Sequence, residues 1–322
     1  MTPESPSRVL VTGGAGFIGS TLVDRLLAEG YQVDVVDDLS SGSLANLSEA
    51  RSERTRRLRF HQLDVSSPQM VELMARCRPE VVFHLAAQPD VRVSVARPVE
   101  DARTNIEGSL QVLEGARSAG TRRVVYTASG GTLYGDTDPA KLPLTEAEPH
   151  RPLSPYGASK RAVLDYLHIY RELYGLEYCA LALANIYGPR QDPHGEAGVV
   201  AIFAGQLVAG RQCVIYGDGS QTRDFVFVDD VVDALVRASR AGDGLVVNVG
   251  TGRETSVLQL YQTMAKLAGE TTAPRFAPAR AGELQRSSLD AARAATRLGW
   301  RAWTGLEEGL ESVLEQAGRR KT

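Results

Sequence analysis

Residues 9–20 read VLVTGGAGFIGS, a short apolar run followed by glycines at positions 13, 16 and 19. The run is typical of a buried strand, and the turn leads into an amphipathic segment that Gly30 ends. Gly13 permits a tight turn, Gly16 lets the backbone approach a pyrophosphate, and Gly19 lets helix and strand pack closely. The spacing predicts a strand–turn–helix unit that binds a dinucleotide at the helix N-terminus.

The alternation of apolar runs and amphipathic segments continues from Arg8 to about Asn185. The further runs are QVDVVDD, LRFHQLDV, EVVFHLAA, RRVVYTAS and EYCALALAN. Such runs are typical of buried parallel strands, so we expect an α/β fold with a Rossmann-type doubly wound parallel sheet. Residues 1–185 would form this nucleotide-binding domain. After it, loop-like segments rich in glycine and proline separate short helical stretches, which predicts a smaller substrate-binding lobe over 186–322. Strands of this lobe could also join the main sheet.

Composition excludes several classes of protein. The chain has 322 residues and a formal charge of -3, which provides no basic field for nucleic acid. No apolar run approaches the roughly 18 residues that a membrane span needs, and the start resembles no leader, so we expect a cytoplasmic protein. Cys77, Cys179 and Cys213 are far apart, which favours free thiols in a reducing compartment. The scattered histidines predict no metal site.

An acidic pair ends the second strand-like run. Asp37 lies 18 residues beyond Gly19, where a carboxylate can bind both hydroxyls of an adenosine ribose. The stretch that follows, DLSSGS, has no arginine or lysine to hold a 2′-phosphate, so NAD is favoured over NADP. Asp38 is left open between a cofactor contact and a plain capping role.

The stretch LSPYGASK, residues 153–160, places Tyr156 one helical turn before Lys160. A phenol titrates near ~10 in water, so it is a useful base at neutral pH only if a cation stabilises its phenolate. Lys160 supplies that cation. A hydroxyl at the end of a neighbouring strand would hold the reacting oxygen, and VVYTASGGTLYG provides Ser129, with Thr127 and Thr132 as alternatives.

With these features the sequence resembles the extended short-chain dehydrogenase/reductases and, within them, the UDP-glucose 4-epimerase branch. The resemblance spans essentially the full chain and rests on TGGAGFIG, HLAAQPDVRVS, YTASGGTLYG, SPYGASK, NIYGPRQDPHGEAG, GDGSQTRDFVFVDDVV and the late ARAGE and LGW. It implies an NAD-dependent enzyme that interconverts UDP-glucose and UDP-galactose through a transient 4-keto sugar. It also implies a homodimer, paired through the helix after Asn105 and the helix that carries Tyr156.

The resemblance also assigns site residues. Ser129, Tyr156 and Lys160 would be catalytic. Ser129 and Tyr156 would contact the sugar, while Asn185, Arg223 and Arg280 would hold the substrate diphosphate. The expected cofactor contacts are Gly13, Gly16, Phe17, Ile18, Gly19, Asp37, Asp38, Ser41, Gly42, Asp64, Val65, Leu85, Ala86, Ala87, Gln88, Thr104, Tyr156 and Lys160.

Other functions stay open. The sugar could instead be a UDP-glucuronate/UDP-galacturonate pair or UDP-GlcNAc. Elimination of water, as in a nucleotide-sugar 4,6-dehydratase, needs an acidic residue beside the hydroxyl, whereas Gly130 and Gly131 follow Ser129. A non-catalytic NAD-binding sensor would tend to lose the tyrosine or the lysine, and both are present.

Overall fold

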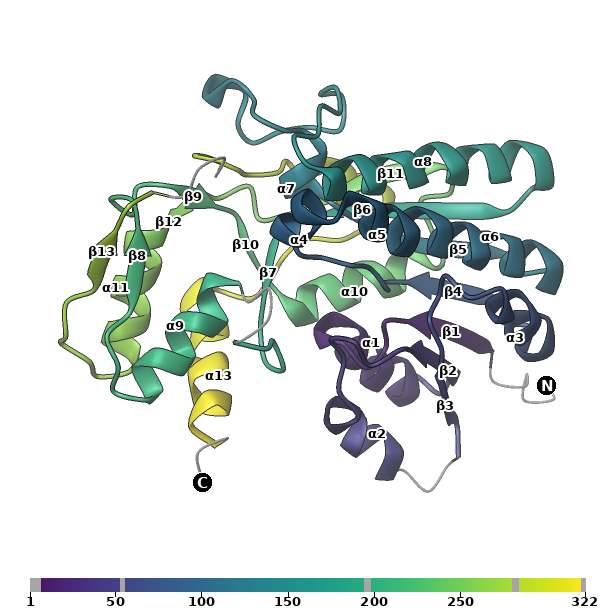
Figure 1. Cartoon of the computed structure of the whole chain (residues 1–322), viewed down its shortest axis with the longest axis horizontal. Helices are drawn as coiled ribbons and strands as arrows, with labels where there is room; N and C mark the ends of the chain where they lie inside the picture. The colour runs from purple at the N-terminus through teal and green to yellow at the C-terminus, as the bar shows by residue number, and fades with distance from the viewer. Residues whose placement is uncertain (1–6, 53–55, 194–197, 280–283, 320–322) are drawn as a thin grey trace.

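The computed structural model describes residues 7–52, 56–193, 198–279 and 284–319, and its centre is a seven-stranded parallel sheet (Figure 1). The strand order is β11-β6-β5-β4-β1-β2-β3. The strands are β1 (Arg8–Thr12), β2 (Gln32–Asp37), β3 (Leu58–Gln62), β4 (Val81–His84), β5 (Arg123–Ser129), β6 (Glu177–Leu183) and β11 (Leu245–Val249). The six apolar runs before Asn185 are therefore confirmed as strands. The seventh strand, β11, returns from the later part of the chain to pair with β6.

Helices cover both faces of this sheet, as the apolar runs predict. One face packs against α1 (Phe17–Ala28) and α10 (Val228–Ala238). The other packs against α3 (Gln69–Cys77), α6 (Gly108–Ala119) and α8 (Pro155–Tyr174). Successive strand side chains point to opposite faces, so each strand contributes to both cores. Within the described ranges, no helix is long and apolar enough to cross a membrane.

The later part of the chain builds a second cluster of helices, seen at the left of Figure 1. Its helices are α9 (Val199–Val208), α11 (Val257–Leu267) and α13 (Leu306–Arg319). Three short strand pairs accompany them: β7 (Asn185–Tyr187) with β10 (Phe225–Phe227), β8 (Val214–Tyr216) with β13 (Arg275–Ala277), and β9 (Thr222–Arg223) with β12 (Thr255–Ser256). The shorter elements are η1 (Leu44–Leu47), α2 (Ser48–Ser52), α4 (Val91–Ala96), α5 (Pro98–Ala102), the π-helix η2 (Arg103–Glu107), α7 (Gly130–Leu133), η3 (Pro139–Lys141) and α12 (Ala292–Arg297).

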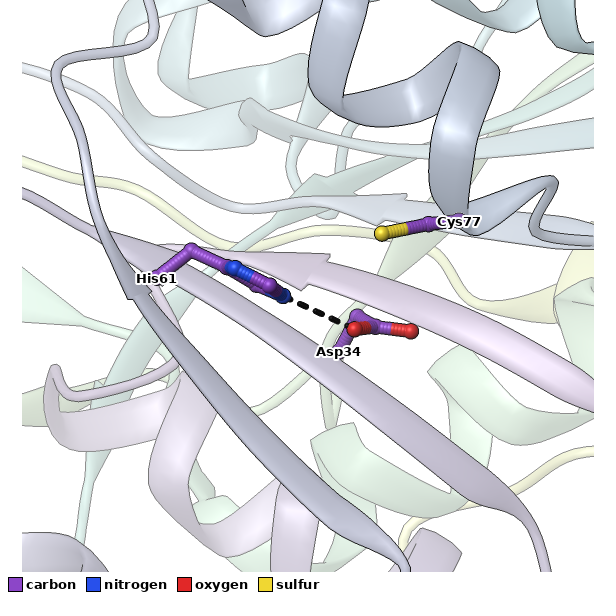
Figure 2. Close-up of side chains that lie close together, drawn as sticks. All are labelled: Asp34, His61 and Cys77. Atoms are coloured by element: carbon purple, nitrogen blue, oxygen red, sulfur yellow. Dashed lines mark hydrogen bonds and ion pairs between the residues drawn. The ribbon is translucent and has the colours of Figure 1, made fainter.

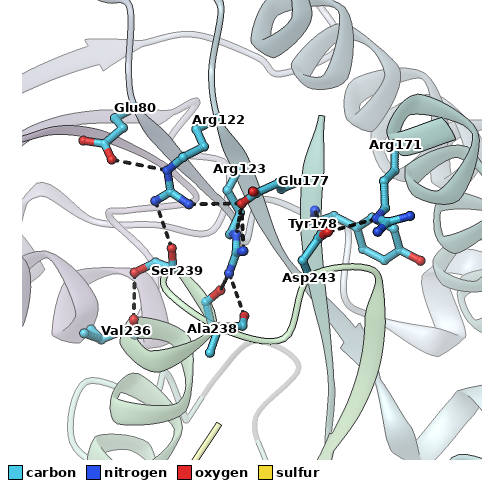
Figure 3. Close-up of polar contacts among 11 residues, drawn as sticks. Glu80, Arg122, Arg123, Arg171, Glu177, Tyr178, Val236, Ala238, Ser239 and Asp243 are labelled. Carbon is cyan, nitrogen blue, oxygen red and sulfur yellow. Dashed lines mark hydrogen bonds and ion pairs between the residues drawn. The ribbon is translucent and has the colours of Figure 1, made fainter. Parts of the chain in front are cut away.

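A buried arginine fastens the end of α10 to the amino ends of the strands (Figure 3). Arg123 is only 5% exposed, and its guanidinium donates to the carbonyls of Ala238 at 3.0 Å and Ala241 at 2.7 Å. It also donates to the Glu177 carboxylate at 2.8 Å. The neighbouring Arg122 is much more exposed and contacts Glu80, Glu177 and the carbonyl of Ser239. This lock holds α10 against β5 and β6.

Asp34, His61 and Cys77 lie together on β2, β3 and α3 (Figure 2). His61 Nε2 is 2.8 Å from Asp34 Oδ1, and burial raises the pKa of the Cys77 thiol to about 11. The pocket beside Asp34 is lined by four arginines, Arg8, Arg56, Arg57 and Arg59. Their charges and the protonated thiol disfavour a cation, so the cluster is best described as a hydrogen-bonded His61–Asp34 pair beside a buried thiol.

Candidate active site

The expected site residues that the structure describes gather along the carboxyl edge of the parallel sheet and the segments that follow it. Thr12, Asp37, His84, Ser129 and Leu183 end β1, β2, β4, β5 and β6. In open parallel sheets ligands bind outside this edge, near the point where the strand order reverses. Here the reversal falls between β1 and β4, which adjoin each other in the sheet. The fold therefore brings the glycine turn and the end of β5 to the same side of the molecule.

The glycine turn fits a dinucleotide because it leaves no room for side chains. Gly13 has φ +68°, and a Cβ on it would lie 2.8 Å from the amide nitrogen of Ala86. A Cβ on Gly19 would overlap the carbonyl oxygen of Gly13. Gly16 caps α1, which begins at Phe17, and as a glycine it has no side chain to bond the first N–H groups of the helix. A pyrophosphate suits such an N-terminus.

Asp37 lies at the end of β2, beside the glycine turn. Its side chain is buried, and it accepts hydrogen bonds from the amides of Ala15 and Leu39, each at 2.9 Å. Burial raises its pKa, and the two amide bonds oppose that rise. Gly42 packs so closely that a Cβ there would lie 2.7 Å from Asp37 Oδ1. Asp38 is exposed and accepts from the Ser40 amide, which is a turn-forming contact.

The remaining cofactor candidates lie on neighbouring loops. Asp64 accepts hydrogen bonds from Ser66, and Val65 packs on Gly108, where a Cβ would lie 2.9 Å from Val65 Cγ2. Gln88 is hydrogen-bonded through its backbone to the side chain of Asn105. Four others are placed as follows: Leu85, Ala86 and Ala87 follow β4, and Thr104 lies in the π-helix. Ile18 lies in α1, and Ser41 is exposed in the loop after β2.

The catalytic candidates Tyr156 and Lys160 lie on the first turns of α8. Ser154 caps this helix by accepting from the Gly157 amide at 3.1 Å, so the helix begins just before the tyrosine. Lys160 is 3% exposed, and its ammonium donates to the Thr127 carbonyl at 3.0 Å. The ammonium lies 5.8 Å from the centre of the Tyr156 ring. Burial lowers the pKa of Lys160 to about 8.

Three hydroxyls compete for the role of holding the reacting oxygen. The Thr127 hydroxyl donates to the carbonyl of His84 at 3.3 Å, and the Thr132 hydroxyl donates to the carbonyl of Ser129 at 3.4 Å. Ser129 ends β5, and its half-buried hydroxyl has no hydrogen-bond partner within the described part of the chain. Of the three, Ser129 is the hydroxyl not already bonded to the backbone.

Two buried groups beside Lys160, Tyr126 and Asp101, are not evident from the sequence. The Tyr126 ring centre lies 4.9 Å from the Lys160 ammonium, and Asp101 on α5 is fully buried. Asp101 accepts from Ser159 Oγ at 2.7 Å and from Asn105 Nδ2 at 2.9 Å. The sequence signal for Asp101 was weak, because PVEDA reads as an ordinary acidic first turn of a helix.

The substrate candidates lie on the strand pair β7–β10 and beside it. The Asn185 amide donates to the Asp224 carbonyl at 2.9 Å, and Arg223 precedes Asp224 directly. The buried Asp224 carboxylate accepts from the amides of Thr251 and Gly252 at 2.9 and 3.0 Å, which ties this pair to the loop after β11. The remaining candidate, Arg280, lies outside the described residues.

Comparisons with known proteins cover nearly the whole chain. Residues 9–250 match the model of the NAD dependent epimerase/dehydratase family. A "UDP-glucose 4-epimerase" of Mycolicibacterium smegmatis is 53% identical over 309 residues, 96% of this chain and 97% of that protein. The solved UDP-glucose 4-epimerase of Thermotoga maritima with UDP-glucose has a TM-score of 0.94 at 43% identity, covering 98% of this chain and 100% of the other.

A second solved structure is the UDP-glucose 4-epimerase of Thermus thermophilus in complex with NAD, with a TM-score of 0.89 at 39% identity. The match covers 96% of this chain and 98% of the Thermus thermophilus chain. The family model spans well over half of the sequence. The chain belongs to the NAD dependent epimerase/dehydratase family.

Proposed function

We propose that this chain is an NAD-dependent UDP-glucose 4-epimerase, which interconverts UDP-glucose and UDP-galactose through a transient 4-keto sugar. The observation that carries the proposal is the pairing of Tyr156 with the buried ammonium of Lys160 at the edge of a dinucleotide-binding sheet. The full-length likeness to relatives with this activity in their names supports it.

The chain's own residues supply binding and proton transfer. The glycine turn and the N-terminus of α1 would hold the pyrophosphate of NAD, and Asp37 would accept the adenosine ribose hydroxyls. The carboxylate of Asp37 would also repel a 2′-phosphate, which favours NAD over NADP. When bound, NAD would supply the hydride chemistry, as acceptor in the first step and donor in the second.

Tyr156 would move the proton in each direction. The positive charge of Lys160 stabilises its phenolate, which then takes the proton from the sugar 4-hydroxyl and later gives it back. Ser129 would hold the same oxygen through its hydroxyl. Since the proton leaves and returns through one group, both directions of the reaction depend on Tyr156.

Epimerisation requires the keto sugar to rotate between the two hydride transfers, so that the hydride returns to its opposite face. The diphosphate must therefore be held firmly while the sugar is held loosely. Asn185, Arg223 and Arg280 are our candidates for the diphosphate contacts, since charge-assisted bonds to phosphate are strong. Elimination of water is disfavoured because Gly130 and Gly131, next to Ser129, offer no acid.

The proposal extends to a homodimer in the cytoplasm. Tyr166, Ile169 and Leu173 form an exposed apolar stripe along α8, and exposed Val95 and Val99 lie on α4 and α5, which pack beside it. An apolar face of this kind suits an isologous pairing of two copies. The three cysteines are buried and free, which suits a reducing compartment.

A panel of nucleotide sugars tests the proposed activity. Purified protein is incubated separately with UDP-glucose, UDP-galactose, UDP-glucuronate, UDP-galacturonate and UDP-GlcNAc, and the products are resolved by chromatography. We expect UDP-glucose and UDP-galactose to interconvert, and extracted cofactor to be mainly NAD. Turnover restricted to the uronates or to UDP-GlcNAc would reassign the sugar. Bound NAD without any turnover would indicate a sensor.

A further inference from the structure

We propose that Asp101 is a positioning residue for the catalytic pair: its buried carboxylate is the counter-charge of the Lys160 ammonium and holds the turn of α8 that carries Tyr156 and Lys160. The inference rests on the proposed function, because it assigns Asp101 a role in the reaction attributed to that pair.

The Asp101 carboxylate is fully buried and is hydrogen-bonded by neutral donors. Ser159 Oγ donates to one oxygen at 2.7 Å. Asn105 Nδ2 and Gln88 Nε2 donate to the other at 2.9 and 3.1 Å. No arginine or lysine lies within ion-pair distance of it among the residues that the structure describes. A buried carboxylate without a nearby positive charge is strongly disfavoured, so the compensating cation must lie a little further away.

Lys160 is that cation, because it follows Ser159 directly and is itself buried. Tyr126 from β5 and Tyr156 from α8 present their rings to its ammonium, and the charge of the ammonium interacts with His84 from β4 and Asp101 from α5. Burial lowers the pKa of His84 to about 3, and burial raises the pKa of Tyr126, so both stay neutral near pH 7. Asp101 is thus the anion available to the ammonium in this group.

Through the hydrogen bond from Ser159, the Asp101 carboxylate also fixes the position of the first turns of α8. Ser159 lies between Tyr156 and Lys160 on the same two turns of α8, and Asp101 fixes it from α5. The π-helix η2 places Asn105 against the other carboxylate oxygen. Position and charge can be separated by experiment, because Ser159→Ala removes the contact and keeps the charge, whereas Asp101→Asn removes the charge.

The first test compares the pH dependence of kcat/KM in these two variants. Burial lowers the pKa of Lys160 to about 8 and Asp101 opposes this, so Asp101→Asn should lower it further, by about one unit. Lys160 must be charged to act, so the alkaline limb of the profile should move to lower pH. Relative to its own maximum, the variant should lose about tenfold at pH 8, against about twofold for the wild type, and almost nothing at pH 6. Ser159→Ala should lower the rate without moving the limb.

The second test uses stability alone, so that it does not depend on the activity. Lys160→Met leaves the Asp101 charge buried without its partner and should lower the unfolding midpoint. Adding Asp101→Asn to Lys160→Met should recover more than half of that loss, and this double variant keeps the test usable if Asp101→Asn alone does not fold.

The outcomes distinguish this inference from the proposed function. An unmoved alkaline limb in Asp101→Asn, or strictly additive losses in the double variant, would overturn the role of Asp101. A different pair of results would separate the two proposals. If the double variant shows that the two charges are coupled, but Tyr156→Phe keeps full turnover, Asp101 is the counter-charge of Lys160 and the catalytic assignment of Tyr156 is wrong.

Discussion

Tyr156 and Lys160 lie on one face at the start of α8, and the surroundings of the lysine set what the tyrosine can do. The ammonium is held by the Thr127 carbonyl and faces the Tyr126 ring, so it has little freedom to move. A charge fixed in this way stabilises a phenolate with no rearrangement at the moment of proton transfer. The proton carrier and its support are therefore separable by substitution.

Tyr156→Phe should fold and bind NAD and UDP-sugar yet lose most of its interconversion rate. The ring is kept, whereas the group that moves the proton is removed, and general acid–base catalysis is typically worth about 100-fold to 10,000-fold. Ser129→Ala should be milder, roughly 10-fold to 1,000-fold, because it deletes one donor to the reacting oxygen. Steady-state rates with UDP-galactose measure both. A Ser129→Ala defect larger than that of Tyr156→Phe would mean that the proton carrier is misassigned.

His84 should make the fold sensitive to acid. It is buried between the hydroxyls of Thr12 and Ser109, and burial lowers its pKa to about 3 from an ordinary value near 6.5. Between pH 3 and pH 6.5, His84 is therefore protonated in the unfolded chain and neutral in the folded protein. Stability is therefore fully present above pH 6.5 and declines as the pH falls toward 3, by at most about 1.4 kcal/mol per pH unit from this group.

Urea unfolding of His84→Gln at pH 4, 5, 6 and 7 measures that effect. We expect a shallower decline with acid than in the wild type, whatever the absolute stability of the variant. His168→Gln is the matched control, since this exposed histidine lies on α8. Equal slopes for wild type and His84→Gln would contradict the assignment.

At the scale of elements, the lock around Arg123 should contribute strongly to stability. Arg123→Met leaves the carbonyls of Ala238 and Ala241 without their donor in a buried place, and breaking a buried charged contact costs roughly 3 kcal/mol. Arg122→Gln, on the exposed neighbour, should cost less than about 1 kcal/mol. Chemical unfolding of both variants checks the ranking. Similar losses for the two would show that the lock contributes no more than a surface ion pair.

The order of the elements along the chain could be predicted as far as Asn185, because near-continuous apolar runs and glycine punctuation are local signals. The strand β11 was allowed for but not placed, since LVVNV is short and its pairing with β6 is set by contacts across more than sixty residues of sequence. The spacing of the glycines, and of Tyr156 and Lys160, predicted the glycine turn and the catalytic pair, and the resemblance to the family supplied the other site residues. It could not find Asp101, whose role depends on α5 packing against α8.

A second apolar set, Val163, Leu167 and Tyr170, also recurs at helical spacing along α8. In the structure these three are buried within the chain, and the exposed stripe of α8 is formed by its neighbours Tyr166, Ile169 and Leu173. Both sets recur at the spacing of an α-helix, so the period alone does not say which of them meets the sheet.

At the scale of the whole molecule, the exposed stripe predicts the oligomeric state. Wild-type protein should be a dimer by light scattering at micromolar concentration, and Ile169→Glu should shift it to monomer by placing a charge in the apolar face. Trp303→Ser changes an exposed apolar residue outside the stripe and should leave the dimer intact. A wild type that is monomeric throughout would contradict the pairing.

The return of β11 to the sheet bears on how the protein is made. β6 is the edge of the sheet until residues 245–249 join it, and α10 covers one face only after residue 228. During synthesis, about sixty residues must therefore be added after β6 before the edge of the sheet is paired, and most of them before its apolar face is covered. Ribosome-bound chains that end just before β11 should accordingly be digested by protease and should bind chaperones, whereas chains that extend well past it should resist.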